Sequence, residues 1–525
     1  MKRRQFLKTT AAGCVVAVTN PVSGLAIEKS ESAHAQRTFE LDELTIAELQ
    51  QGLQSGKYSS KDLVEKYSDR INDVDKKGPA LNSVIEMNPD AEQIAAALDR
   101  ERKEKGPRGP LHGIPILIKD NIDTHDRMMT TAGSLALVGA RPARDAAVAQ
   151  RLREAGAVIL GKTNLSEWAN FRSTKSSSGW SARGGQTRNP YALDRNPCGS
   201  SSGSGAAVAA NLCAAAIGTE TDGSIVCPSN ANSLVGIKPT LGVVSGSGII
   251  PIAHSQDTAG PMARTVADAA ILLGAIAQNQ NVDFSKSLDR NGLRGMRLGI
   301  ARKHFGFNER VDKLMNGLLD EMKRLGAVLV DPADIPTSGK FDDSEFEVLL
   351  YEFKADLNAY LAGLGPQAPV RSLKDVIEFN EKNRDREMPY FGQDIMIKAQ
   401  QKGPLTSKGY LQALRKNHRL TRSQGIDFVM KKNRLDALVA PTGGPPWPTD
   451  WINGDHFTGG YSSASAVAGY PHITVPAGYI FGLPVGISFF GSANTEAKLI
   501  KIAYAFEQAT KARRPPKFLE RASFS

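Results

Sequence analysis

Serine and glycine are the only residues from Gly199 to Gly205, within the stretch "NPCGSSSGSGAAVAANLC". A serine hydroxyl becomes a nucleophile when a neighbouring base removes its proton, and glycine lets the backbone make tight turns. A glycine–serine run is often a flexible linker between domains. The letters G-S-S-S-G also match the nucleophile elbow of serine hydrolases, G-x-S-x-G, which would make Ser201 the nucleophile.

The residues around this run disfavour both interpretations. The stretch "AAVAANLCAAAIGTE" follows with hardly any charge, whereas a flexible linker continues into solvent-facing chain. It predicts a helix of small residues that packs closely against other backbone. The elbow needs a preceding strand, but "GGQTRNPYALDRNPC" is rich in turn residues. We therefore expect a tight turn at a helix N-terminus, where amide groups can act as donors.

Two further segments carry residues that could do chemistry. In "GTETDGSIVCP", Ser224 follows Asp222 and Gly223, and it comes 24 residues after Ser200. In "GPLHGIPILIKDN", a short apolar run that predicts a buried strand ends abruptly at Lys119. Taken alone, Ser224 would be interpreted as an ordinary serine in a turn, and Lys119 as a solvated lysine at the surface.

Together with "DTAGPMARTVADAA" farther along the chain, these segments resemble the signature of the amidase signature family. The resemblance extends from about residue 42 to residue 515. Within the family, "APTGGPPWPTDWINGDHFTGG" and "GTETDGSIVCP" are most similar to peptide amidases. The resemblance implies the amidase signature fold.

The resemblance also implies a Ser–Ser–Lys triad. Ser224 would be the nucleophile that accepts the acyl group, Ser200 a bridging serine on a cis peptide bond, and Lys119 the base. The reference pKa of lysine, about 10.4, leaves it charged at neutral pH. Burial at the end of an apolar run is one way to lower that pKa. Ser200 would then relay the proton from Ser224 to Lys119 and return it to the leaving amine.

The negatively charged oxygen of a tetrahedral intermediate needs preformed hydrogen-bond donors. The resemblance places this oxyanion hole at the backbone N–H groups of Thr221, Asp222, Gly223 and Ser224. Many relatives have glycine in place of Asp222, and the sequence leaves open what a carboxyl group does there. Ser201 and Ser202 are expected to support the site by hydrogen bonding from behind.

The pattern of the whole chain predicts an α/β fold, with one large domain in which a mixed, twisted β-sheet is covered by helices on both faces. A helix followed by a strand recurs at "REAGAVIL" and "KRLGAVLV". Residues 41–75 are predicted to be helical, with capping pairs at Thr45–Glu48 and Ser59–Asp62. Residues 340–430 also look largely helical. The strand-like runs "LDALVAP", "HITVPAGYI" and "PVGISFF" follow, and a helix over 495–515 closes the chain.

The first residues resemble an export signal. A basic start, "MKRRQFLK", precedes the apolar run "AAGCVVAVT" and a small-residue ending at Ala26. The paired arginines resemble a twin-arginine signal, so we expect an exported, periplasmic protein. The signal would cover residues 1–26, or extend to residue 35 because "AHA" is a second cleavage site. The amidase domain would then span 27–525.

Composition narrows the classes of partner. The net charge is +10, and residues 1–26 carry four positive charges and no acid, so the remaining chain has +6. No long basic run exists outside the signal, and no apolar stretch is long enough to span a bilayer. We therefore expect neither a nucleic-acid partner nor stable membrane insertion. Motifs for metals, phosphates and dinucleotides are absent from the sequence, so no metal or cofactor is expected.

Three cysteines lie outside the signal, at Cys198, Cys213 and Cys227. Their number is odd and none forms a C-x-x-C pair, which disfavours a disulfide framework or a zinc site. We expect all three to be small buried residues.

The sequence thus predicts an exported hydrolase that converts carboxamides to carboxylate and ammonia through an acyl-enzyme, with peptide C-terminal amides as the first candidate. One alternative is an amidase for aryl, aliphatic or cyclic amides. A second is the glutaminase subunit of a tRNA-dependent amidotransferase, which an export signal disfavours. A third is a binding protein on an inactivated amidase scaffold, which the three filled triad positions disfavour. The expected partner is a small peptide or small-molecule amide, and the oligomeric state stays open.

Overall fold

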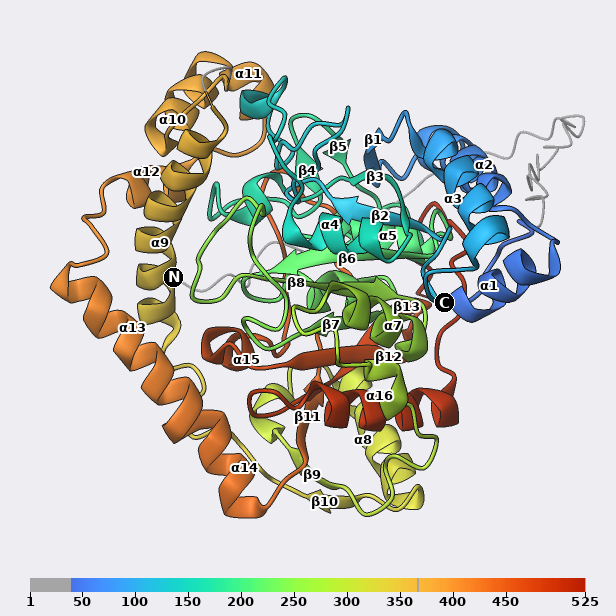
Figure 1. The fold of residues 1–525 in the computed structure, drawn as a ribbon. Coiled ribbons are helices and arrows are strands. Elements are labelled where there is room, and N and C mark those ends of the chain that lie inside the picture. Colours follow the sequence, from blue (N-terminus) through green and yellow to red (C-terminus); the bar gives the residue numbers. More distant parts are fainter. Residues whose placement is uncertain (1–38, 366–367, 525) are drawn as a thin grey trace, which may run out of the picture. The chain divides into compact units, whose positions relative to one another are not determined.

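An 11-stranded mixed β-sheet organises the computed structural model, which describes residues 39–365 and 368–524 (Figure 1). The strand order is β1-β3-β2-β6-β8-β7-β12-β13-β11-β9-β10. Parallel pairs stand toward the two edges (β3–β2–β6 and β11–β9–β10), and the strands between them pair antiparallel. This confirms the predicted mixed α/β sheet.

The strands of this sheet are β1 (Val84–Met87), β2 (Pro115–Lys119), β3 (Val158–Thr163), β6 (Ala215–Glu220), β7 (Val235–Lys238), β8 (Thr258–Ala263), β9 (Arg297–Ile300), β10 (Val328–Val330), β11 (Ala437–Pro441), β12 (His472–Ile480) and β13 (Leu483–Phe490). A separate two-stranded sheet pairs β4 (Trp180–Ser181) with β5 (Gly185–Gln186). The runs predicted as strands near residues 115, 158, 328, 437, 472 and 484 are all strands.

Helices cover both faces of the sheet. One group, α4 (Ala147–Glu154), α7 (Val266–Ile276) and α16 (Glu496–Thr510), packs together and against β3, β8 and β12. Two short helices, α5 (Ser202–Ala209) and α6 (Val226–Ala231), contact each other and pack against β6 and β13. The helix α8 (Glu309–Arg324) also packs on β12. The predicted closing helix ends at Thr510, five residues earlier than expected.

Two further groups of helices flank the sheet. The N-terminal group is α1 (Ile46–Ser55), α2 (Ser60–Arg70) and α3 (Ala91–Lys105); both predicted capping pairs are capping boxes, at the starts of α1 and α2. The second group forms a long arc from α9 to α14 (Figure 1). Its members are α9 (Asp342–Gly363), α10 (Leu373–Lys382), α11 (Arg384–Glu387), α12 (Asp394–Gln400), α13 (Lys408–Thr421) and α14 (Asp427–Asn433), followed later by α15 (Ser463–Ala468). Residues 340–430 are therefore largely helical, as predicted.

The helix that follows the glycine–serine run has no exposed face. Every residue of α5 is buried. A Cβ atom at Gly203 would clash with the backbone carbonyl oxygens of Ser83 and Asn164, so only glycine fits there. The prediction of a small-residue helix packed on neighbouring backbone is confirmed, and the linker interpretation is wrong.

The residues from Leu41 onward form one compact unit. The predicted export signal, residues 1–26 or 1–35, lies outside the described residues. Within the described ranges, none of the helices combines the length and the apolar character needed to cross a bilayer.

Candidate active site

Lys119 is the last residue of β2, a strand whose residues are all buried, so its side chain lies in the protein interior. Its side chain has no exposed surface. The Nζ atom lies 2.8 Å from Ser200 Oγ and 2.9 Å from Thr219 Oγ1. Burial lowers the pKa of Lys119 to about 7, although Asp257 and Glu220 oppose this shift. The lysine is therefore able to exist as the neutral amine near neutral pH, as expected from the apolar run before it.

The two serines come from different segments that one backbone hydrogen bond joins. Ser200 follows Gly199 across a cis peptide bond and immediately precedes the start of α5. Ser224 lies between the end of β6 and the start of α6. The Ser201 N–H donates to the Ser224 carbonyl oxygen at 3.2 Å. Lys119, Ser200 and Ser224 are thus brought to one place by β2, α5 and the β6–α6 turn.

Glu220 holds the β6–α6 turn in shape. Its Oε2 accepts hydrogen bonds from the N–H groups of Ile225 (2.7 Å) and Val226 (3.0 Å). In the described part of the chain, the N–H groups of Thr221, Asp222, Gly223 and Ser224 donate to no acceptor. Gly223 has a φ of 80°, which lets this turn reverse tightly. Free backbone donors beside Ser224 could stabilise a negatively charged oxygen at this turn.

The hydroxyl groups of Ser201 and Ser202 form hydrogen bonds with backbone groups. Ser201 Oγ donates to the Thr219 carbonyl oxygen (3.1 Å) and accepts from the Thr219 N–H (3.2 Å). Ser202 Oγ donates to the Cys198 carbonyl oxygen at 2.6 Å. Both hydroxyls are fully buried. The elbow interpretation is therefore disfavoured further, because Ser201 is engaged on β6 and has no histidine partner.

A disulfide joins the two serine segments, and the expectation of three unpaired cysteines is wrong for two of them. Cys198 and Cys227 are bonded, with Cα atoms 5.9 Å apart, and Cys213 is free and buried. Cys198 lies two residues before Ser200, and Cys227 lies three residues after Ser224. The pairing could not be read from the sequence, because the 29-residue separation closes only through the α5–β6–α6 path.

Other residues at the site escaped the sequence analysis. Thr219 bonds the Lys119 amine, Glu220 caps the turn, and Asp257 accepts from Thr221 Oγ1 at 2.6 Å. Thr219 and Glu220 belong to the segment "GTETDGSIVCP", so a carboxylate beside a turn of free amides was a usable signal. Asp257 could not be recognised from the sequence, because only the pairing of β6 with β8 brings it next to Thr221.

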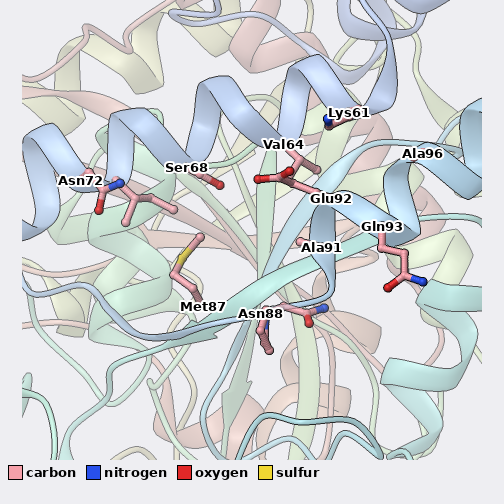
Figure 2. Close-up of a pocket in the computed structure, with 12 residues that line it drawn as sticks. Lys61, Val64, Ser68, Asn72, Met87, Asn88, Ala91, Glu92, Gln93 and Ala96 are labelled. Atoms are coloured by element: carbon pink, nitrogen blue, oxygen red, sulfur yellow. The ribbon is translucent and has the colours of Figure 1, made fainter.

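Two cavities differ in their relation to these residues. A groove of about 650 Å³ lies between α2 and α3, and Figure 2 shows side chains from both helices along it. None of its lining residues belongs to the serine or lysine segments. A pocket of about 410 Å³ instead reaches Asn121, Thr219 and Thr221. Because Thr219 touches Lys119, the second pocket is the one that adjoins the candidate site.

One cluster at the rim of that pocket has the residue types of a metal site. His254, Glu352 and Asp356 could each offer one ligand atom within 4.8 Å of the others. However, His254 Nδ1 and the His254 N–H both bond Asp356 Oδ2, and Tyr410 donates to Glu352. The hydrogen bond with Asp356 raises the pKa of His254 to about 8. An ion-pair network that fastens α9 to the 253–257 loop accounts for the cluster.

Comparison with known proteins identifies the family of this chain. Residues 62–500 match the family model described as amidase. A protein of Arabidopsis thaliana described as a probable amidase is 43% identical over 517 residues, which cover 94% of this chain and 95% of the relative. One of the subunits of the glutamyl-tRNA(Gln) amidotransferase of Halorhodospira halophila is 34% identical, with 89% of this chain and 97% of the relative covered. The chain therefore belongs to the amidase family and is an amide-hydrolysing enzyme.

Among solved structures the similarity is higher. The native peptide amidase from Stenotrophomonas maltophilia superposes with a TM-score of 0.87 at 51% identity, covering 91% of this chain and 99% of that chain. Within the family, the fold of this enzyme is thus closely similar to that of a peptide amidase.

We predict that the Cys198–Cys227 disulfide contributes about 3–4 kcal/mol to the free energy of unfolding, as expected for closing a loop of this length. Urea denaturation with and without dithiothreitol measures this contribution. The reductant should destabilise the wild type and the Cys213→Ala variant alike, and it should leave a Cys198→Ala/Cys227→Ala variant unchanged. An equal response of all three proteins would show that the bond does not stabilise the fold.

Proposed function

We propose that this enzyme hydrolyses the C-terminal carboxamide of peptides through Ser224, Ser200 and Lys119. The observation that carries the proposal is the 2.8 Å contact between the buried Lys119 amine and Ser200 Oγ, beside the turn that bears Ser224. A neutral lysine can accept a proton that a charged one cannot. The 51% identity to a peptide amidase supports the choice of substrate.

In the proposed reaction, Ser224 Oγ attacks the carbonyl carbon of the amide. Its proton passes to Ser200, and the proton of Ser200 passes to Lys119. The C–N bond then breaks, and the proton returns through Ser200 to the nitrogen, which leaves as ammonia. Water, deprotonated along the same route, attacks the acyl-enzyme, releases the carboxylate and restores the Ser224 hydroxyl.

The free amides of the turn would stabilise the intermediate. The carbonyl oxygen becomes negatively charged when Ser224 adds, and donors fixed in advance lower the energy of that state. The N–H groups of Thr221 to Ser224 are fixed by Glu220 on one side and by the bond between Ser201 and Ser224 on the other. Such donors need no rearrangement as the charge develops.

Aromatic side chains near the disulfide and along the loop before α15 favour a peptide over a simple amide. Trp447 packs on the Cys198–Cys227 disulfide, and Phe457 meets Trp447 edge to face. Trp451 stacks on Tyr390 with ring centroids 4.7 Å apart. Phe457 and Trp451 are 53% and 43% exposed, respectively. An exposed apolar surface of this kind marks a binding region, and substrate side chains preceding the amide suit it.

We also propose that the protein is exported, with residues 1–26 or 1–35 as a twin-arginine signal and the periplasm as its destination. The disulfide supports this proposal, because such bonds form and persist in oxidising compartments. The alternative of a tRNA-dependent glutaminase subunit has less support: the amidotransferase relative is 34% identical and the peptide amidase 51%.

The decisive experiment measures ammonia release by the purified mature protein from a C-terminally amidated dipeptide. We expect turnover by the wild type and a loss of roughly 10⁴-fold or more in kcat for Ser224→Ala and Lys119→Ala, since triad members act as a unit. Ser201→Ala is the matched control and should keep most of the activity. If the enzyme hydrolysed only free glutamine or only aryl amides, the proposed peptide substrate would be wrong. An active Ser224→Ala variant would refute the mechanism.

The pH dependence tests the role of Lys119 separately. Because only the neutral amine can act as the base, kcat/KM should fall by about tenfold per pH unit below a midpoint near 7. Above this midpoint Lys119 is deprotonated and no longer limits the rate. Lys119→Arg should be inactive across the range, because the guanidinium stays protonated. An acid limb that persists in an active Lys119 variant would assign it to another group.

The aromatic surface gives a third test. Phe457→Ala and Trp451→Ala should each raise KM for a peptide amide with large apolar side chains by roughly 3–10-fold, since an aromatic contact contributes about 0.5–1.5 kcal/mol. Their turnover of a small aliphatic amide should not change. Phe428→Ala on α14, which removes an exposed phenylalanine elsewhere, should affect neither substrate. Equal effects of all three variants on KM would exclude a peptide-binding role for Phe457 and Trp451.

A further inference from the structure

Two carboxyl groups lie behind the β6–α6 turn, on the α9 side: that of Glu345, which is buried, and that of Asp222, which is partly buried. We propose that Glu345 is a positioning residue for amide hydrolysis, which fixes the turn from Thr221 to Ser224 through a proton that it shares with Asp222. The inference rests on the proposed function, because it gives that turn the task of binding the oxyanion. It also assigns a role to Asp222, which the sequence left open.

Asp222 uses its carboxylate for contacts within the protein. Its Oδ1 accepts a hydrogen bond from Ser462 Oγ, and its Oδ2 accepts one from Ser463 Oγ at 2.6 Å. These two serines stand at the start of α15. The carboxyl groups of Asp222 and Glu345 also face each other at interaction distance, and this contact raises the pKa of Glu345. Asp222 therefore fastens the turn to two other elements, α15 and α9.

Glu345 reaches the same turn by a second route. It lies in the first turn of α9 and is only 8% exposed. Its Oε1 accepts from Gln256 Nε2 at 2.9 Å, and the same amide group donates to the Thr221 carbonyl oxygen at 3.2 Å. Glu345 thus holds the backbone of Thr221 through Gln256 and the side chain of Asp222 directly. Movement of Glu345 would shift the first two residues of the segment that carries the free amides.

The contact between the two carboxyl groups requires a proton. Two ionised carboxylates have no donor between them and repel each other in a low-dielectric interior. Burial and the Asp222 charge hold the pKa of Glu345 well above its ordinary value. Burial also raises the pKa of Asp222, but the hydroxyls of Ser462 and Ser463 donate to both of its oxygens and stabilise its charge. Glu345 is therefore the protonated partner, and its O–H donates to Asp222, although the pair titrates as a unit.

The neighbouring elements offer this pair mostly negative groups. The charged and titratable residues that face it are Lys238 on β7, Glu220 on β6, Asp342 on α9, and Tyr461 before α15. Burial lowers the pKa of Lys238 to about 8, so its positive charge also declines in alkaline solution. Loss of the shared proton would then place two carboxylates beside the oxyanion hole. That change would both loosen the turn and disfavour a negative oxygen there.

The test compares three variants across neutral and alkaline pH. Glu345→Gln keeps the size, an N–H donor for Asp222 and an oxygen for Gln256, but it does not titrate. Its kcat at neutral pH should stay within about threefold of the wild type, and its alkaline decline should disappear. Glu345→Ala should lower kcat by roughly 10–100-fold with little change in KM, as expected when an oxyanion hole is disordered. Glu347→Gln, the same substitution at a residue paired with Lys402, should behave as the wild type.

A second readout keeps this test independent of the substrate. A p-nitrophenyl phosphonate monoester reacts with Ser224 by forming a P–O bond to Oγ and losing p-nitrophenolate. The tetrahedral adduct keeps a negatively charged oxygen, so the rate of this reaction also depends on the oxyanion hole. That rate should follow the same order of variants and the same pH dependence. If no amide is hydrolysed but labelling follows this order, the proposed function fails and the role of Glu345 stands.

Two results would overturn the role of Glu345. An alkaline decline that survives in Glu345→Gln would belong to Lys238 or another group. Equal losses of kcat in Glu345→Gln and Glu345→Ala, with thermal unfolding showing that both variants are folded, would show that Glu345 contributes no shared proton.

Discussion

The cost of burying an ammonium group is the constraint on which the rest of this structure depends. Lys119 is placed at the end of a strand that lies between two others, so its amine cannot reach water. Desolvation penalises the charged form, and the protein offers mainly hydroxyl and carbonyl partners at hydrogen-bond distance instead of a carboxylate. The same pattern recurs at Lys238, whose pKa burial also lowers. Burial in the sheet thus lowers the pKa of Lys119, and the segment that carries Ser200 supplies the hydroxyl that the amine contacts.

Those segments are held together by contacts of different kinds. The disulfide joins the chain on the outer sides of the two serines, and the hydrogen bond from Ser201 to Ser224 joins it on the inner side. Glu220 fixes the start of α6, and Gln256 holds the carbonyl group of Thr221. The turn is therefore fixed by covalent, backbone and side-chain contacts, which agrees with a site whose donors are ordered before substrate arrives.

Much of this could be predicted from the sequence, because the signals were local. The apolar run before Lys119 implied both a strand and a buried amine, and the charge-free stretch after Ser204 implied a closely packed helix. Both capping boxes could be read because their residues are three positions apart. The sequence did not reveal the pairing of Cys198 with Cys227 or the contact of Asp222 with Glu345, because each depends on how distant elements pack. No pattern in the sequence indicates that the first turn of α9 lies near the end of β6, because the two segments meet only in the folded chain.

The packing of α5 determines where members of such a family can change. A helix whose neighbours touch its backbone accepts no larger side chain, so the segment that carries Ser200 has little freedom to vary. The loop between β11 and α15, in contrast, exposes Trp451, Ile452 and Phe457 on a surface with room around them. Its two ends are nonetheless fixed, near Trp447 by the disulfide and at Ser462 by Asp222. The middle of that loop can therefore be substituted without moving either fixed end, and so without disturbing the serine segments beside them.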